Sequence, residues 1–178
     1  MKLQSHRNIT KVHSNQGFTL VELVVVILIL GILAATALPK FMNVNTAAHE
    51  AAVAGAGGGL GAGVALAHAQ WVANGSKTGA TDIDDLAGFG DGLLDVNTSG
   101  WPTDTGGNNT TADATDCTEI WGGVMQNPPS IATSGTTTDY TASYTSPTCT
   151  FLYNGDGGGG MSIQYTTTTG AVVVDSTI

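Results

Sequence analysis

Residues 17–39 read GFTLVELVVVILILGILAATALP, and this stretch decides how the chain begins its fold. The 21 residues from Phe18 to Leu38 are apolar except for Glu22 and two threonines. A helix of about 20 such residues is long enough to cross the hydrocarbon core of a bilayer. The sequence therefore predicts a membrane-spanning helix close to the N-terminus.

The residues before this stretch are basic. Lys2, Arg7 and Lys11 lie within the first 17 positions, which contain no acidic residue. Basic flanks stay on the cytoplasmic side of a membrane, so we expect the N-terminus inside the cell and everything after Lys40 outside.

Three interpretations of the apolar segment compete. A secretory signal is one, because Ala35-Thr36-Ala37 offers a small-residue cleavage site, although Glu22 interrupts the apolar core. A plain single-pass anchor is the second, but a carboxylate one turn inside the membrane costs about 3 kcal/mol and needs a reason. The third interpretation supplies that reason.

The sequence from Gly17 to Glu22, followed by an apolar helix with Gly31 and then Pro39, closely resembles the N-terminus of type IV pilins and pseudopilins, the class III prepilins. The resemblance covers roughly residues 1–55. It implies that a prepilin peptidase removes residues 1–17 as a leader on the cytoplasmic side, cutting between Gly17 and Phe18. It also implies N-methylation of Phe18.

The chemistry of Glu22 gives this processing a purpose. Cleavage creates a positive amine on Phe18, which can pair with the Glu22 carboxylate of a neighbouring subunit when the helices pack side by side. An unpaired carboxylate among apolar helices is unfavourable, so we expect Glu22 to set the stagger of assembly. Gly31 permits close helix approach, and Pro39 is expected to kink the helix or, alternatively, to mark the end of the span.

Residues 40–74 are expected to continue the helix into a head, stopping at Asn74-Gly75. Six glycines between Gly55 and Gly63 weaken this expectation, because glycine is a poor helix former. Either the helix breaks there or packing overrides the propensity. We favour the helix, with Gly55, Gly59 and Gly63 forming a smooth face.

Residues 75–116 are rich in Asp, Gly, Thr and Asn and are expected to form a loop region. Its crowded acids are weak calcium candidates without the EF-hand pattern, and a solvated acidic face is the favoured interpretation. These acids are Asp82, Asp84, Asp85, Asp91 and Asp95. His49 and His68 lack the spacing of metal ligands, so no metal site and no cofactor are predicted.

Residues 117–178 are expected to form an antiparallel sheet. Ile120, Trp121, Val124 and Met125 recur at helical spacing and predict a short amphipathic turn first. Strands are expected over 140–144, 149–153, 161–166 and 172–174, with Met161, Ile163 and Tyr165 on one face. The predicted fold class is α+β, the type IV pilin fold, with a long N-terminal helix packed on a C-terminal antiparallel sheet.

The two cysteines, Cys117 and Cys149, have neither a CxxC spacing nor a haem signature. If the chain is exported, a disulfide between them would stabilise the fold by roughly 3 to 4 kcal/mol on the chain-entropy model. Two buried free thiols are the alternative.

The body also resembles a type IVa pilin, and within that family the mannose-sensitive haemagglutinin (MSHA) pilins. HAQWVANG at 68–75, the segment from Cys117 to Pro129, and TGAVV at 169–173 carry this resemblance. The 29 residues after Cys149 depart from the many type IVa pilins whose second cysteine lies close to the C-terminus.

This resemblance implies a major pilin, the structural subunit of a pilus that attaches cells to surfaces. The subunit would span the inner membrane once, in contact with lipid. It would then leave through an inner-membrane assembly platform and join an extracellular homo-oligomeric filament, which could bind surface glycans. A type II secretion pseudopilin, a minor pilin and a sugar-binding membrane-anchored ectodomain are the alternatives.

Charge and residue content exclude other classes. Five basic residues stand against fourteen acidic ones, and loss of the three basic residues of the leader takes the formal charge from −9 to −12. Nucleic-acid phosphates need clustered Lys and Arg, so no nucleic-acid partner is expected. No Ser/His/Asp or Cys/His set is evident, so an enzyme is not expected. Trp71, Trp101 and Trp121 could stack on sugars, although core packing is the favoured role.

Overall fold

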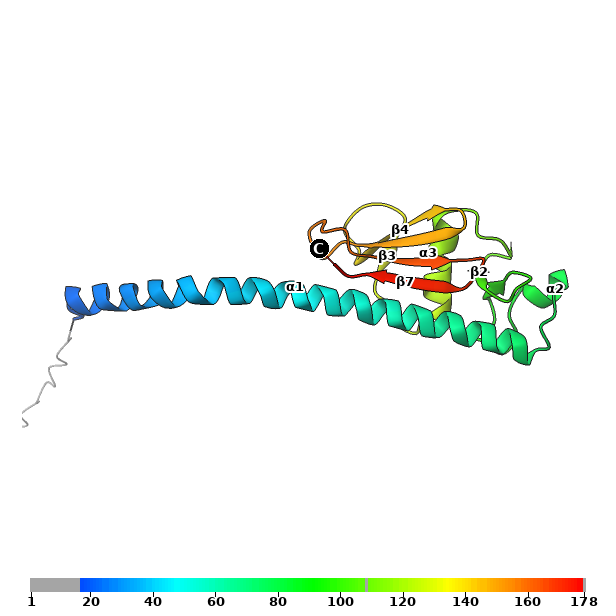
Figure 1. Cartoon of the computed structure of the whole chain (residues 1–178), viewed down its shortest axis with the longest axis horizontal. Coiled ribbons are helices and arrows are strands. Elements are labelled where there is room, and N and C mark those ends of the chain that lie inside the picture. The colour runs from blue at the N-terminus through cyan, green and yellow to red at the C-terminus, as the bar shows by residue number, and fades with distance from the viewer. Residues whose placement is uncertain (1–16, 108, 178) are drawn as a thin grey trace, which may run out of the picture. The chain divides into compact units, whose positions relative to one another are not determined.

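A computed structural model describes residues 17–107 and 109–177 (Figure 1). The chain divides into two compact units, residues 1–42 and 43–178. The leader expected at residues 1–17 lies outside the described residues except for Gly17.

The first element is α1, Leu20–Ala73, a helix of 54 residues. Pro39 lies inside α1, so the helix does not end where the apolar run ends. The part of α1 between Leu20 and Leu38 leaves almost all of its side chains exposed.

The part of α1 within the second unit stays helical through all six glycines, so the helix prediction is confirmed. A Cβ at Gly57 would collide with the Val174 side chain, and one at Gly63 would collide with the carbonyl oxygen of Val124. Close approach of the sheet and of another helix therefore requires glycine at these two positions and offsets its poor helix propensity.

The expected glycine face at Gly55, Gly59 and Gly63 is correct only for its last member. A Cβ at Gly55 would meet no described atom within 4 Å, and one at Gly59 would lie in ordinary contact, 3.5 Å from the Met125 sulfur. Residues spaced by four are slightly more than one helical turn apart, so their side chains rotate gradually around the helix axis. A row at this spacing therefore does not stay in contact with one packed neighbour.

The region 75–116, expected to be a loop, contains several short elements. These are helix α2, Ala80–Ile83, and two antiparallel strands, β1, Asp95–Val96, and β2, Pro102–Asp104. Helix α3, Ala114–Val124, also begins here, three residues before Cys117. Asp113 and Asp116 form a reciprocal capping box that fixes this start, so α3 is longer than the predicted turn.

Five strands form the main sheet in the order β3-β4-β5-β6-β7. The β4-β5, β5-β6 and β6-β7 pairs are antiparallel, as predicted, while the short β3 pairs with β4 in parallel. The strands are β3, Ile131–Ala132; β4, Tyr140–Thr145; β5, Thr148–Tyr153; β6, Ser162–Thr166; and β7, Ala171–Asp175. The α+β type IV pilin fold class is thereby confirmed.

One face of this sheet forms the core of the head. Figure 1 shows α3 running across the strands, and α3 contacts β4 and β5. Met161, Ile163 and Tyr165 are fully buried, as their alternation predicted. The second half of α1 adds its own buried side chains to the same cluster: Val53, Leu60, Val64 and Ala67.

The three tryptophans pack within the head, Trp101 by stacking on His68. Trp121 is fully buried between Tyr140 and Phe151, and its indole nitrogen donates to the carbonyl of Pro129 at 3.0 Å. The Trp71 indole nitrogen donates to the carbonyl of Lys77 at 2.8 Å.

Both head histidines have partners. His68 stacks on Trp101 with ring centroids 3.9 Å apart, and its Nδ1 lies 3.2 Å from the Gly100 carbonyl. The Nδ1 of His49 lies 3.1 Å from the Tyr153 hydroxyl. These contacts favour satisfied structural histidines over metal ligands.

The predicted disulfide is present. Cys117 on α3 and Cys149 on β5 are joined across the core, with Cα atoms 5.7 Å apart and both residues fully buried. The alternative of two free thiols is wrong. The bond closes a loop with a sequence separation of 32 residues, which supports the sequence-based figure of roughly 3 to 4 kcal/mol.

Two glycine substitutions in α1 should have opposite effects. Gly63→Ala should lower the free energy of unfolding by roughly 1–3 kcal/mol, because its methyl group meets the backbone of α3. Gly58→Ala should raise it by about 0.5–1 kcal/mol, because the position is helical and open. Denaturant unfolding of the detergent-solubilised chain measures both, and equal shifts in one direction would contradict the packing described above.

Candidate functional site

The start of α1 is built from a reciprocal set of hydrogen bonds. The backbone N–H and the hydroxyl of Thr19 donate to the Glu22 carboxylate at 2.8 and 2.9 Å, and the Glu22 N–H donates to the Thr19 hydroxyl at 3.2 Å. This is the arrangement of a capping box, and a carboxylate in the first turn also complements the helix dipole. Glu22 is therefore held beside Phe18, the residue that cleavage after Gly17 would make the new N-terminus.

The segment from Phe18 to Leu38, on both sides of Glu22, exposes its large apolar side chains. Phe18 is 94% exposed and Leu20 is 78% exposed, and the large residues through Leu38 remain between 45% and 78% exposed. By length and composition, α1 is apolar enough to cross a membrane. Burial of this surface must come from lipid or from another protein chain.

The peptide bond between Gly17 and Phe18 lies before the helix. Residues 17–19 have no helical structure, and α1 begins at Leu20. A Cβ at Gly17 would meet no described atom within 4 Å, so nothing in the described part of the chain covers this residue. The expected cleavage position is thus both non-helical and accessible.

The profile of the family described as "Prokaryotic N-terminal methylation motif" matches residues 12–38. This match spans Gly17, Phe18 and Glu22, and it supports a type IV pilin-like prepilin with a membrane-anchoring helix. Comparisons with curated proteins and with solved structures gave no match.

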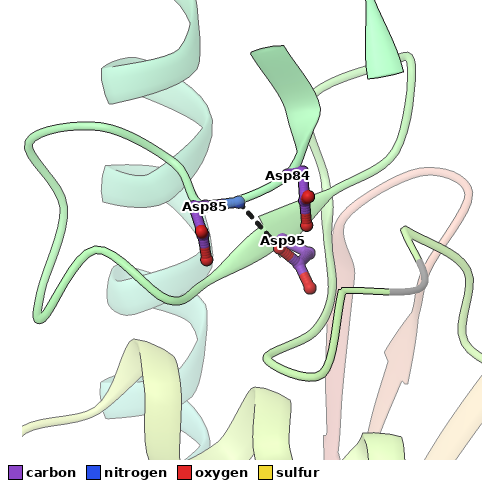
Figure 2. Close-up of side chains that lie close together, drawn as sticks. All are labelled: Asp84, Asp85 and Asp95. Carbon is purple, nitrogen blue, oxygen red and sulfur yellow. Dashed lines mark hydrogen bonds between the residues drawn. The ribbon is translucent and has the colours of Figure 1, made fainter. Parts of the chain in front are cut away.

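The structure brings together three of the five weak calcium candidates. Figure 2 shows the side chains of Asp84, Asp85 and Asp95, whose carboxylates offer oxygens within 4.8 Å of one another. Asp82 instead pairs with Lys77 at 3.4 Å. Asp91 is exposed and accepts from the Leu93 N–H at 3.1 Å.

Asp95 contradicts the expectation of a solvated acidic face. It is fully buried, and its two carboxylate oxygens accept from the N–H groups of Asp85 at 2.8 Å and Gly107 at 2.7 Å. Asp95 therefore joins two loop segments that are separate in sequence. The solvated-face expectation remains correct for Asp82, Asp85 and Asp91, which are exposed.

A second acidic group, not predicted from the sequence, is formed by Asp104, Asp116 and Glu119. Asp116 accepts from the N–H groups of Ala112 and Asp113, and Glu119 accepts from the Thr105 N–H at 3.1 Å. The spacing of three between Asp116 and Glu119 was a visible signal of a shared helix face. Asp104 gave no such signal, because it lies on β2 and only the packing of β2 against α3 brings it to the other two residues.

Asp84 belongs to the first acidic group, and its surroundings disfavour the charged form of its carboxyl group. Loss of hydration raises its pKa above the ordinary 3.8, and the neighbouring carboxylate of Asp95 raises the pKa further. A raised pKa means that the folded chain holds this proton more tightly than the unfolded chain. The folded state therefore loses stability as the pH rises from about 3.8 through the raised pKa of Asp84.

Replacing Asp84 by Asn should remove this cost. We expect Asp84→Asn to raise the melting temperature at pH 7 and to have little effect below pH 3.8, where the native side chain is also neutral. Thermal unfolding at the two pH values measures the difference. Asp91→Asn is the matched control, with little change at either pH, and an Asp84→Asn gain of equal size at both values would contradict the charge explanation.

The processed chain should begin at N-methylated Phe18. Only there is a free amine close enough in sequence to Glu22 for neighbouring helices to pair the two groups. Intact-mass and peptide mass spectrometry of the protein purified from membranes would identify the first residue. A mature chain that begins after the apolar run, at Lys40 for example, would support a secretory signal instead.

Proposed function

We propose that the protein is the major structural subunit of a type IV pilus filament, assembled from the inner membrane and used for attachment to surfaces. One observation carries the proposal. The part of α1 from Leu20 to Leu38 is apolar and exposed on all sides, and its single carboxylate, Glu22, lies in the first turn, next to the residue that prepilin processing would leave with a free amine.

The charge of Glu22 is the driving feature of the proposed assembly. Within the described chain, its carboxylate accepts hydrogen bonds from the N–H and the hydroxyl of Thr19, which are neutral donors. They satisfy hydrogen bonding but leave a negative charge in apolar surroundings, which is costly. The amine of Phe18 in a neighbouring subunit neutralises that charge, and one relative position of two helices achieves the pairing.

The route to the filament follows from the N-terminal segment. The N-terminus begins in the cytoplasm, and the helix from Phe18 to Leu38 holds the chain in the lipid bilayer. Prepilin peptidase cleaves after Gly17 and methylates Phe18, and an inner-membrane assembly platform then adds the subunit to the filament. Subunit contacts replace lipid around the apolar helix, so the same side chains serve both stages.

A pilus subunit is favoured over a type II secretion pseudopilin by the disulfide. The bond between Cys117 and Cys149 is buried in the head and ties α3 to β5. Pseudopilins of the major type usually lack such a loop, whereas it is typical of the type IVa pilins that the body resembles. The MSHA-like resemblance supports adhesion as the use of the filament.

Electron microscopy of sheared surface filaments, combined with mass spectrometry of their subunit, tests the proposal. This chain should be the main component of long extracellular filaments. Its confinement to the cell envelope, without surface filaments, would favour the pseudopilin. Its presence as a trace component of filaments built from another subunit would make it a minor pilin.

Glu22→Ala, expressed as the only copy, should reduce surface filaments to background while the protein still reaches the membrane. Removal of the charge makes membrane insertion easier but eliminates the pairing that sets subunit stagger. Filament counts by electron microscopy and membrane fractionation measure the two effects. Glu50→Ala is the control on the same helix, and normal filament numbers in Glu22→Ala cells would show that the carboxylate does not direct assembly.

A further inference from the structure

The C-terminal end of α3 lies beside a cavity in the head. Residues 89–91 line one side of this cavity, and residues 122–126 line the other. Its volume is about 340 Å³, at the lower end of the range of roughly 300–1,000 Å³ that is typical of small-ligand sites. The cavity is therefore large enough for one long side chain or a small molecule.

Glycines form much of the cavity wall. A Cβ at Gly123 would lie 3.0 Å from the Leu94 side chain and 3.1 Å from that of Thr105, so the end of α3 packs closely against this region. A Cβ at Gly90, which has a φ of 53°, would lie 3.7 Å from the Gly123 carbonyl oxygen. A Cβ at Gly122 would meet no described atom within 4 Å. The wall formed by these glycines is therefore backbone.

The carbonyl groups at the end of α3 lack the capping that the end of α1 has. The last four carbonyls of a helix have no partner within the helix itself. At the end of α1, the N–H groups of Asn74, Gly75 and Ser76 donate to the last turn at 2.9 to 3.1 Å. Within the described chain, no backbone N–H donates to the carbonyls of Gly122 and Gly123. These two acceptors are therefore open to a donor from another molecule.

The cavity is also negatively polarised without a compensating cation. A helix C-terminus carries about −0.5 elementary charge, and the last turn of α3 contains no basic residue. Asp91 adds a full charge on the opposite wall, where it is exposed and uses Oδ1 to accept from the Leu93 N–H. Lys77 is the only Lys or Arg in residues 43–178, and it pairs with Asp82 at 3.4 Å. Both walls therefore favour a positively charged ligand.

Phe89 and Met125 give the cavity an apolar side. Both line the cavity, are half-buried and pack against the core of the head. An aromatic ring attracts a cation over its face, and the planar guanidinium group stacks well in that position. Guanidinium also has five N–H donors, enough for two carbonyls and a carboxylate together. This lining favours arginine over lysine.

The chain itself cannot supply an arginine to the head. Arg7 is its only arginine and lies on the basic flank before the apolar helix, which stays on the cytoplasmic side of a membrane, whereas the head follows that helix. Lys40 and Lys77 are the only Lys or Arg residues after Gly17. An arginine that enters the cavity must therefore belong to a different protein.

We propose that the cavity at the end of α3 is a binding site for an arginine side chain of another protein. The guanidinium group donates to the carbonyls of Gly122 and Gly123 and pairs with the Asp91 carboxylate. The aliphatic stem of the arginine lies against Phe89 and Met125. Binding of one such side chain is weak by itself, so the site recognises one residue within a larger contact.

NMR titration of the full ¹⁵N-labelled chain in an uncharged detergent tests the site. The probe is Nα-acetyl-arginine amide, which carries one guanidinium group and no other charge. It should cause saturable shifts in the amide signals of Gly90, Gly122, Gly123 and Gln126. Nα-acetyl-citrulline amide is the matched control, because it has nearly the same shape without the charge, and it should cause no saturable shift.

Two substitutions in the cavity should weaken arginine binding. Asp91→Asn should raise the dissociation constant about two- to fivefold, the range expected for loss of an exposed ion pair. Gly122→Lys supplies a cation to the last turn of α3 and should raise it about fivefold or more. Gly58→Lys is the control, because it makes the same change at another open helical glycine and should leave the dissociation constant unchanged.

Three outcomes would overturn the proposal. Equal binding of the arginine and citrulline probes would show that charge does not direct recognition. Shifts confined to residues away from the cavity would place the site elsewhere. Tighter binding of Nα-acetyl-lysine amide than of the arginine probe would reject the guanidinium assignment and point instead to Lys40 of a second copy.

Discussion

The head depends on the close packing of the second half of α1 against α3 and the sheet. Gly63 lies against the carbonyl of Val124, and Gly57 lies under Val174, so helix and neighbours approach to a distance that any side chain would prevent. Leu60 and Val64 then enter the same core cluster as Trp121. Without these two glycines the helix would stand away from the sheet, and the buried apolar contacts that stabilise the head would be lost.

Polar interactions fix the path of the loops around this core. The region 75–116 has few large apolar residues, and its path is set by carboxylates that accept from backbone N–H groups of distant segments. Asp95 holds residues 85 and 107 together, and Asp116 with Asp113 starts α3. The disulfide then ties α3 to β5. Negative charge is thus used as a structural element, at a cost that Asp84 shows through its raised pKa.

The two halves of α1 have different tasks and different residue content. Residues 20–38 carry large apolar side chains with Glu22 as their single charge, whereas residues 51–73 are uncharged and carry many small residues, some packed on the head and others open. In the proposed filament, the charge of Glu22 sets the position of each subunit along the axis.

The sequence by itself determined the elements whose signals are local: the apolar helix, the Gly17–Glu22 motif, the alternating strand residues Met161, Ile163 and Tyr165, and the two cysteines as a pair. Hydrophobic period and spacing report such features directly, because they depend on neighbours along the chain. Only the tertiary structure decided which glycines are packed, that Asp95 is buried, that Asp104 joins Asp116 and Glu119, and that β3 pairs in parallel with β4. Each of these depends on contacts between residues far apart in sequence, and no local pattern specifies which distant segment will approach.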